Sequence, residues 1–295
     1  MDLVRASHLY KVFGKNERQV IERLKAGESR EELASLGTAA VIDVSFEVAK
    51  GETFVVMGLS GSGKSTLIRM INGLWSPSEG TVEVAGKVVS DMNDAQLRAL
   101  RRDHVSMVFQ HFALLPHLTV RENAAYGLKL QGKLKQKERL EKANEWLNTV
   151  GLNGWGDKYP HQLSGGMQQR VGLARALAAE TDILLMDEAS SALDPLIRRE
   201  MQDQLLELQG ALNKTIIFIT HDLNEAMYLG DHIAVMRNGR VAQIGTSDEI
   251  LTQPADDYVA DFVQDVDRSR VLTASAVMRP TEACLLYTSD AADDS

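Results

Sequence analysis

The fold of this 295-residue chain is decided by Gly58-Leu59-Ser60-Gly61-Ser62-Gly63-Lys64-Ser65. This stretch fits the pattern G-x-x-x-x-G-K-[ST], between an apolar strand-like run (52–57) and a helix-like run (64–74). Glycines let the loop turn tightly and aim its backbone N–H groups at an anion, and the helix N-terminus adds partial positive charge. The sequence therefore predicts a phosphate-binding loop. A chance glycine-rich turn is the alternative, but it explains neither neighbour.

The residues of this loop have distinct expected roles. Lys64 should contact the β- and γ-phosphates of a nucleoside triphosphate, and the Ser65 hydroxyl should bind Mg²⁺. The residues expected to bind the nucleotide here are Gly58, Ser60, Gly61, Ser62, Gly63, Lys64, Ser65 and Thr66. No separate structural metal is predicted, because the single cysteine and the seven histidines show no ligand spacing.

Two carboxylates follow another apolar run. Residues 183–186 are Ile-Leu-Leu-Met, and Asp187 and Glu188 come directly after them. Beside a phosphate loop, Asp187 can hold Mg²⁺, and Glu188 can polarise a water for in-line attack on the γ-phosphate. Two acids after a strand are otherwise typical of a solvated loop. Their combination with the phosphate loop favours the catalytic interpretation.

Apolar periodicity predicts an α/β fold. Short apolar runs at 183–186 and 215–220 are typical of buried parallel strands, and a helix-like segment (197–212) lies between them. Other strands and hairpins are expected at 3–9, 41–48, 52–57, 81–89 and 105–109, and around the Asn238-Gly239 turn.

The remaining segments read as helices. Residues 17–37 are charged and helical in pattern, with Ser29 and Glu32 spaced as a capping box. Two or three polar helices between 120 and 150 suggest a separate lobe. A further helix is expected to begin at Gly165 or Gly166.

Composition excludes several classes of protein. The formal charge of −9 argues against nucleic-acid binding, which needs a basic face. No apolar run approaches the roughly 18 residues of a membrane span, and the N-terminus lacks the apolar core of a signal peptide. The single cysteine, Cys284, excludes an internal disulfide framework. We therefore expect a cytoplasmic protein that reaches a membrane only through a partner.

The last residues differ in character from the rest. Residues 284–295 resemble a translated sequencing adapter, and we interpret 281–295 as a non-native tail or the truncated start of a C-terminal region. A short acidic native tail is the alternative.

A second glycine motif identifies the class. Leu163-Ser164-Gly165-Gly166-Met167-Gln168-Gln169-Arg170 resembles the signature sequence of the ATP-binding subunits of ATP-binding cassette (ABC) transporters. In that family the motif opens a helix and meets the γ-phosphate held by the opposite subunit. The bare glycine amides at a helix start suit an anion. The resemblance implies nucleotide contacts from Ser164, Gly165, Gly166 and Gln168.

Other positions match the family residue by residue. Gln110 resembles the glutamine that touches Mg²⁺ and the attacking water, and His221 resembles the switch histidine at the γ-phosphate. Residues 191–194 resemble the D-loop at the dimer interface, with Asp194 as a nucleotide-site residue. Phe13 resembles the aromatic that stacks on adenine, with Tyr10 as the alternative. The implied catalytic residues are Glu188, His221 and Gln110, and the implied metal ligands are Ser65, Gln110 and Asp187.

The resemblance covers about residues 3–280 and implies one ATPase domain over 1–280. Its fold would be that of a P-loop NTPase, with a RecA-like core sheet, an antiparallel β subdomain and a helical subdomain at about 111–165. The implied chemistry is hydrolysis of ATP with Mg²⁺, by two copies that close head to tail. The implied partners are transmembrane permease subunits and, indirectly, a periplasmic or lipid-anchored substrate-binding protein, with no nucleic acid. The expected location is the cytoplasmic face of the inner (plasma) membrane.

Two segments point to a subgroup. The insertion at 17–37 and the segment 262–274 resemble the ATPases of glycine betaine/proline betaine (quaternary amine) importers. Members of that group often carry paired cystathionine-β-synthase domains after the point where this chain stops. The alternatives are an importer of another small solute, a soluble ABC ATPase acting on DNA or ribosomes, and a non-catalytic regulatory cassette.

Overall fold

The structure is a computed structural model that describes residues 2–110, 112–188 and 194–264. The predicted tail (281–295), residues 191–193 of the predicted D-loop and most of the 262–274 segment lie outside this part of the chain. Within it, no helix is both long enough and apolar enough to cross a membrane.

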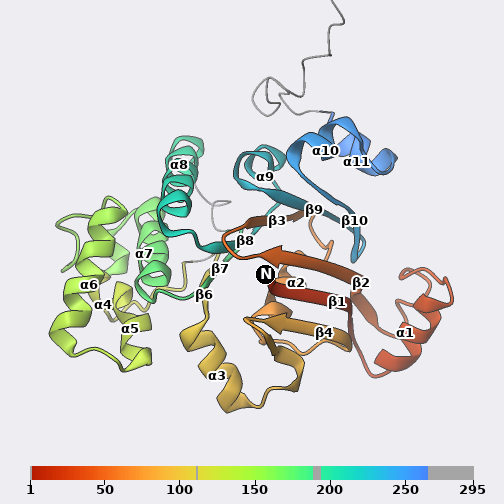
Figure 1. The fold of residues 1–295 in the computed structure, drawn as a ribbon, viewed down its shortest axis with the longest axis horizontal. Helices are drawn as coiled ribbons and strands as arrows, with labels where there is room; N and C mark the ends of the chain where they lie inside the picture. Colours follow the sequence, from red (N-terminus) through yellow and green to blue (C-terminus); the bar gives the residue numbers. More distant parts are fainter. Residues whose placement is uncertain (1, 111, 189–193, 265–295) are drawn as a thin grey trace, which may run out of the picture.

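A six-stranded sheet forms the centre of the molecule (Figure 1). Its order is β10-β9-β3-β8-β7-β6, and only the edge pair β10–β9 is antiparallel. The strands are β3 (Thr53–Gly58), β6 (Val105–Val108), β7 (Ile183–Asp187), β8 (Thr215–Thr220), β9 (His232–Arg237) and β10 (Arg240–Gly245). All residues of β3, β7 and β8 are buried, which confirms the predicted parallel α/β core.

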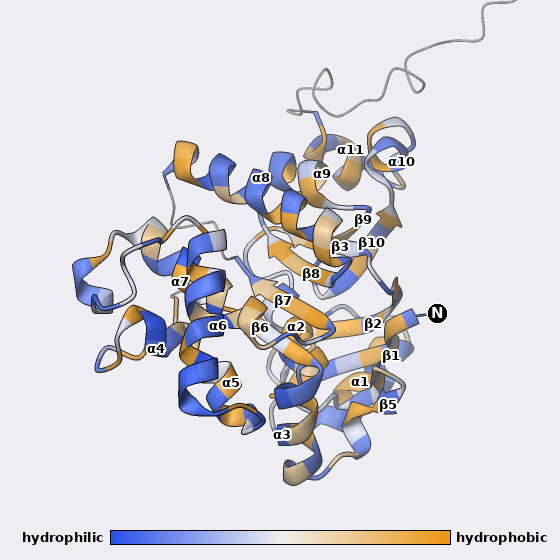
Figure 2. Cartoon of the chain, turned by 60° about the vertical axis from the view of Figure 1, so that its left-hand side comes forward, coloured by the Kyte–Doolittle hydropathy of each residue, from blue (hydrophilic) through white to orange (hydrophobic). Residues whose placement is uncertain are grey.

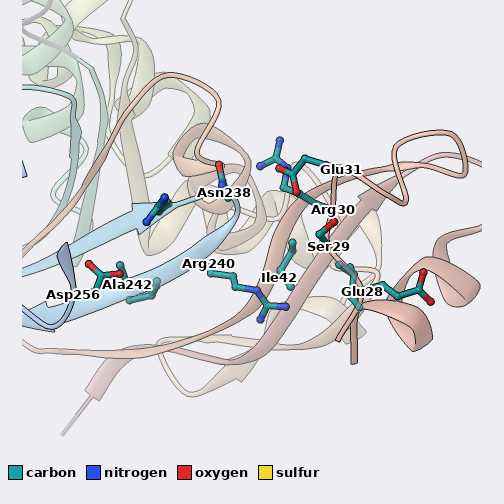
Figure 3. Close-up of a pocket in the computed structure, with 12 residues that line it drawn as sticks. Glu28, Ser29, Arg30, Glu31, Ile42, Asn238, Arg240, Ala242 and Asp256 are labelled. Atoms are coloured by element: carbon teal, nitrogen blue, oxygen red, sulfur yellow. The ribbon is translucent and has the colours of Figure 1, made fainter. Parts of the chain in front are cut away.

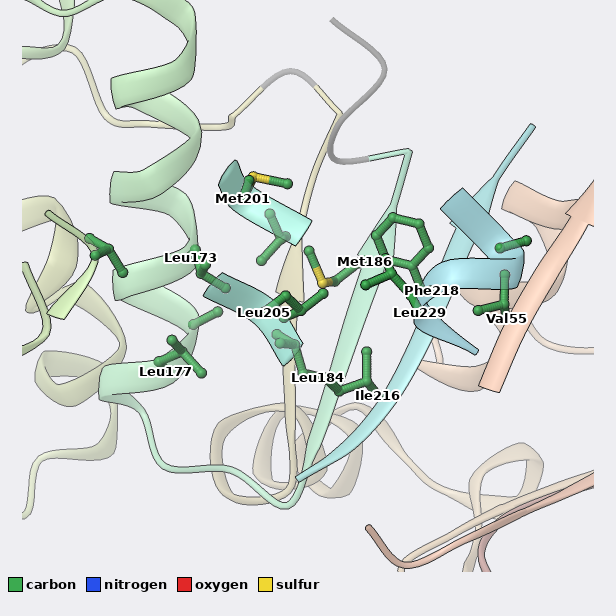
Figure 4. Packing of buried hydrophobic residues seen from close by; sticks show 14 of the residues in the cluster. Val55, Leu173, Leu177, Leu184, Met186, Met201, Leu205, Ile216, Phe218 and Leu229 are labelled. Atoms are coloured by element: carbon green, nitrogen blue, oxygen red, sulfur yellow. The ribbon is translucent and has the colours of Figure 1, made fainter. Parts of the chain in front are cut away.

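Each buried strand contributes to two cores, because successive side chains point to opposite faces of a sheet. On one face, Leu184 and Phe218 pack with α7 (Gly165–Ala178) and α8 (Pro195–Leu212), as Figure 4 shows. On the other face, Leu185 packs with α2 and a second sheet. Figure 2 accordingly shows β7 and β8 as hydrophobic.

The second sheet is antiparallel, as predicted, with the order β2-β1-β4-β5. Its strands are β1 (Asp2–Phe13), β2 (Thr38–Ala49), β4 (Glu79–Val84) and β5 (Lys87–Val88). Helix α2 (Lys64–Ile71) packs between this sheet and the central one. It ends three residues before the predicted end, ahead of Gly73, whose φ of +68° cannot continue a right-handed helix.

The segment between β1 and β2 is helical only in its first half. Helix α1 covers Glu17–Lys25, and the prediction of helix up to residue 37 is wrong, because Gly27 adopts a φ of +98° and turns follow it. The predicted Ser29–Glu32 pair does form: the Ser29 N–H donates to the Glu32 carboxylate (2.9 Å), and the Glu32 N–H donates to the Ser29 hydroxyl (3.3 Å).

Three helices, of 5, 6 and 14 residues, lie to one side of the central sheet, at the left of Figure 1. They are α4 (Val120–Ala124), α5 (Tyr126–Gln131) and α6 (Gln136–Thr149). Their buried residues, such as Ala124 and Leu147, join the same core as α7. The helical lobe therefore rests on the helix that begins with the signature motif.

Four more helices were not predicted from the sequence: α3 (Asp94–Asp103), α9 (Leu223–Leu229), α10 (Ser247–Thr252) and α11 (Asp257–Phe262). Single 3₁₀ turns lie at Val89–Asp91 and Pro160–Gln162. The missed helices have 6 to 10 residues, and each begins after an Asn, Asp or Thr whose side chain accepts a backbone N–H. Those capping residues are the signal that could have located them.

Candidate functional site

The glycine loop joins the end of β3 to the start of α2 and is pressed against two neighbouring strands. Gly58 and Gly63 have φ angles of +146° and +104°. A Cβ atom at Gly58 would lie 2.3 Å from the carbonyl oxygen of Met236, and one at Gly63 would lie 2.2 Å from that of Ala40. Only glycine fits at these two positions, so packing fixes the path of the loop.

The predicted Asn238-Gly239 turn supports the same loop. Both residues have positive φ angles, +50° and +82°, which suits a tight hairpin between β9 and β10. The Gly239 N–H donates to the carbonyl of Ser62 (3.0 Å), and the Gly239 carbonyl accepts from the N–H of Ile42 (2.8 Å). The hairpin therefore ties the loop to β2, a connection that sequence reasoning did not foresee.

A cavity of about 280 Å³ opens beside the loop. It is lined by most of the predicted phosphate-binding residues and by residues from three other segments: Ser60, Gly61, Gly63, Lys64, Ser65 and Thr66, with Arg30, Thr38, Ala40 and Glu188. Gly58 and Ser62 lie behind this wall, where the Gly58 carbonyl accepts from Lys64 and the Ser62 side chain is buried. Backbone N–H groups, a lysine and an arginine surround this cavity, and together they can bind a polyanion such as a chain of phosphates.

Lys64 is the buried cation of this cavity, with 4% of its surface exposed. Its ammonium donates to the carbonyls of Gly58 (2.7 Å) and Leu59 (3.1 Å) and lies 4.0 Å from the Glu188 carboxylate. Burial lowers its pKa, while the carboxylates of Glu188 and Asp187 act against that shift. A phosphate in the cavity would favour the charged ammonium.

The side chains of Ser65 and Asp187 bring two oxygen atoms together next to the loop, where they could bind a cation. The Ser65 hydroxyl donates to the Asp187 carboxylate at 3.2 Å. Burial raises the pKa of Asp187, and the hydrogen bond from Ser65 partly offsets the rise. A hard cation with oxygen ligands fits this donor set. Among the described residues there is no group of three or more acids, histidines and cysteines that could hold a metal ion.

Glu188 brings the predicted catalytic residues together at the carboxyl edge of the sheet. Its carboxylate accepts from the amide of Gln110 (3.3 Å) and lies 3.5 Å from the ring of His221. Its backbone has a φ of +45°, and its N–H donates to the carbonyl of Ile219 (3.0 Å) on the neighbouring strand. Such strain at a reactive position suits a side chain held for chemistry.

Phe13, the predicted adenine-stacking residue, does not line this cavity but neighbours a residue that does. It is paired across the sheet with Thr38, a lining residue, and is 38% exposed. Its ring packs edge-on against Trp75, with centroids 5.0 Å apart, a partner that sequence reasoning missed. The alternative, Tyr10, is 5% exposed and is part of the core beneath the 17–37 segment, where a nucleotide base has no room to stack.

The signature residues form a second group away from this cavity. Ser164 caps α7 by accepting the N–H of Met167 (3.3 Å), and Gly165 and Gly166 open the helix. The Gln168 amide donates to the carbonyls of Pro160 and Leu163. None of residues 164–168 belongs to the described lining of the cavity, and neither does Asp194, which caps α8. One chain thus presents two separate halves of the predicted site.

Arg175 is a further functional candidate that the sequence did not reveal. From the last turn of α7 it donates to the carbonyls of Ala113 (2.7 Å) and Phe112 (3.1 Å). Both of these residues have positive φ angles, and they follow Gln110 closely in the chain. Arg175 therefore ties the Gln110 loop to the signature helix. A lone arginine within a helix carries no sequence signal for such a role.

This combination defines a P-loop ATPase: a phosphate loop between β3 and α2, and an acidic pair at the end of β7. Residues 41–191 also match the ABC transporter family model, and the chain belongs to that family. Its ATP-binding members hydrolyse ATP, and this chain is such an ATP hydrolase.

Similar proteins support this assignment over most of the chain. The glycine betaine transport ATP-binding protein OpuAA of Bacillus subtilis is 54% identical over 281 residues, which cover 95% of this chain and 67% of OpuAA. The glycine betaine/proline betaine transport ATP-binding protein ProV of Escherichia coli is 52% identical over 279 residues (93% and 69%). The dimeric ATP-binding cassette MJ0796, solved with ADP and phosphate, superposes with a TM-score of 0.71 at 32% identity and covers 83% of this chain and 98% of its own.

Proposed function

We propose that this protein is the ATP-hydrolysing subunit of an importer for glycine betaine, proline betaine or a related quaternary amine. Relatives named for that transport are more than 50% identical to it over nearly its whole length. In this proposal it is peripheral on the cytoplasmic face of the membrane, bound to permease subunits that a substrate-binding protein loads. The observation that carries the chemistry is the approach of Gln110, His221 and Lys64 to Glu188.

Each group at this edge has a defined task. Lys64 and the loop amides neutralise the phosphates, and the Glu188 carboxylate takes a proton from the attacking water. Gln110 orients that water, and His221 contacts the γ-phosphate. Ser65, Asp187 and Gln110 would hold Mg²⁺, which supplies positive charge to the phosphate oxygens when bound.

The head-to-tail pair completes the site. Because Ser164 and its glycines lie outside the Lys64 cavity, a second copy has to supply them to the γ-phosphate. ATP favours the closed pair to the extent that it makes contacts there that the open pair lacks. Closing moves the helical lobe, about residues 111–165, which passes the motion to the permease.

Replacing Lys64 by alanine tests the nucleotide site. The variant should lose most of its affinity for ATP, measured by titration calorimetry, because the loop loses its buried charge. Lys137→Ala is the matched control, since Lys137 is 88% exposed on α6. Unchanged affinity in Lys64→Ala would refute the assignment of this cavity.

The cargo is tested separately, by uptake of labelled glycine betaine in cells that carry the chain with its permease. Uptake of a different solute instead would overturn that part.

A further inference from the structure

Arg30 reaches the nucleotide cavity from a segment that has no part in the predicted phosphate loop. Its side chain lines the same cavity as Lys64 and Glu188 and is 27% exposed. It also lines a second cavity of about 350 Å³, between the 28–31 turn and the β9–β10 hairpin, and Figure 3 shows it there above Ile42. Arg30 thus stands at the boundary between these two hollows.

The turn that carries Arg30 is held in place on both sides. The reciprocal hydrogen bonds of Ser29 and Glu32 enclose it, and the Arg23 guanidinium donates to the Glu28 carboxylate just before it (2.7 Å). Leu33, directly after the turn, is fully buried in a small core with residues of β1 and β2. The guanidinium is therefore presented by a fixed backbone, which reduces the entropy cost of using it for binding.

The ion pair that Arg30 makes is weak, so its guanidinium remains suited to binding an anion. Its ion pair with Glu31 is long, 3.8 Å, and the Glu31 side chain is 67% exposed, so this contact is worth little. The planar guanidinium can offer two parallel N–H groups to phosphate oxygens, which Lys64 cannot do. The neighbouring lining residues Thr38 and Ala40 begin β2, next to Phe13, on the side of the cavity expected to receive the adenosine.

We propose that Arg30 binds the phosphate chain of the nucleotide and that its turn forms a second wall of the ATP site. This inference rests on the proposed function and adds a residue to it. The segment between β1 and β2 then acts as a nucleotide contact rather than as a spacer, and bound nucleotide holds it against the phosphate loop.

Nucleotide titrations of Arg30→Gln and Arg30→Lys test the proposal. Arg30→Gln should bind ATP about tenfold more weakly, as expected for one charge-assisted contact at a partly exposed site, and should bind adenosine as the parent does. The ATP affinity of Arg30→Lys should lie between that of Arg30→Gln and that of the parent. Arg18→Gln is the matched control, because Arg18 belongs to the same segment, pairs with Glu22 and is 94% exposed.

The outcomes separate the proposal from the function on which it rests. Parent-like ATP affinity in Arg30→Gln, with loss of affinity in Lys64→Ala, would overturn the role of Arg30 alone. Equal loss of ATP and adenosine binding, with a lower urea midpoint for the nucleotide-free protein, would show that Arg30 only supports the fold. Failure of the parent itself to bind ATP would refute the proposed function instead.

Discussion

Lys64 and Asp187 are both ionisable, and burying their charged forms away from water costs free energy. Burial lowers the pKa of the lysine and raises the pKa of the aspartate, so in each case the neutral form gains. The two shifts have the same largest cause, which is the burial of each side chain away from water. Phosphate beside Lys64 and a cation beside Asp187 would each favour the charged form. Burying these two groups therefore lowers the stability of the nucleotide-free protein, but it places both side chains where the phosphates and the cation would bind.

Asp187→Asn should stabilise the nucleotide-free protein at neutral pH while removing Mg²⁺-dependent turnover. The folded-state pKa of Asp187 lies above its unfolded value, so the penalty is present above the folded pKa and disappears as pH falls below the unfolded value of about 4. The melting temperature should be higher than that of the parent at pH 7.5, and the difference should shrink as the pH falls towards 4 and disappear below it. A lower melting temperature at pH 7.5 would contradict this interpretation.

Some site residues could be predicted from the sequence because the chemistry dictates them. A phosphate loop needs glycines, a lysine and a hydroxyl at fixed spacing, and the structure places Lys64 and Ser65 at the cavity accordingly. Arg30, Trp75 and Arg175 could not be predicted in this way. Their partners are distant in the chain or are backbone carbonyls, so only the folded path of the chain reveals their contacts.

At the scale of elements, α7 has two functions at its two ends. Its N-terminus carries the signature glycines, and Arg175, three turns further on, holds the carbonyls of Phe112 and Ala113. The loop after Gln110 is therefore attached to the helix that would reach the second copy in the proposed head-to-tail pair. Movement of α7 on dimer closure would be transmitted to Gln110, and so to Glu188.

Arg175→Met should weaken this attachment. Two carbonyls lose their donor, so the free energy of unfolding in urea should fall by about 1–3 kcal/mol, and turnover should fall because Gln110 is less well placed. Arg175→Lys keeps the charge and the donor hydrogens but not the fork that reaches both carbonyls, so it should recover part of both. The control is Arg18→Met on α1, where the arginine is 94% exposed and pairs with Glu22 of the same helix. Parent-like stability and turnover in Arg175→Met would remove the residue from this role.

The success of element prediction followed the strength of the local signal. Strands β7 and β8 are unbroken apolar runs, and burial on both faces leaves them little alternative. The 17–37 segment was predicted as helical throughout because its charged pattern continues past Lys25. Its second half instead forms turns that bury Leu33 against the antiparallel sheet, so tertiary packing overrode local periodicity.

At the scale of the whole molecule, the two predicted half-sites, the Lys64 cavity and the Ser164 helix start, do not share a cavity in the part of the chain that the structure describes. The phosphate cavity and the Ser164 helix start share no described lining residue, and each has the chemistry to bind part of a triphosphate. The sequence predicted both halves from their motifs. Their separation depends on how α7 and the helical lobe pack beside the central sheet (Figure 1).

Sedimentation of Glu188→Gln with and without ATP tests the central claim most directly. The variant keeps the phosphate contacts but lacks the base, so turnover should fall about 10²- to 10⁴-fold while ATP remains bound. With ATP and Mg²⁺ it should sediment at twice the 32.5 kDa of the single chain, and Ser164→Arg in the same background should return it to the single mass. A Glu188→Gln protein that binds ATP but stays at the single mass would contradict the shared site.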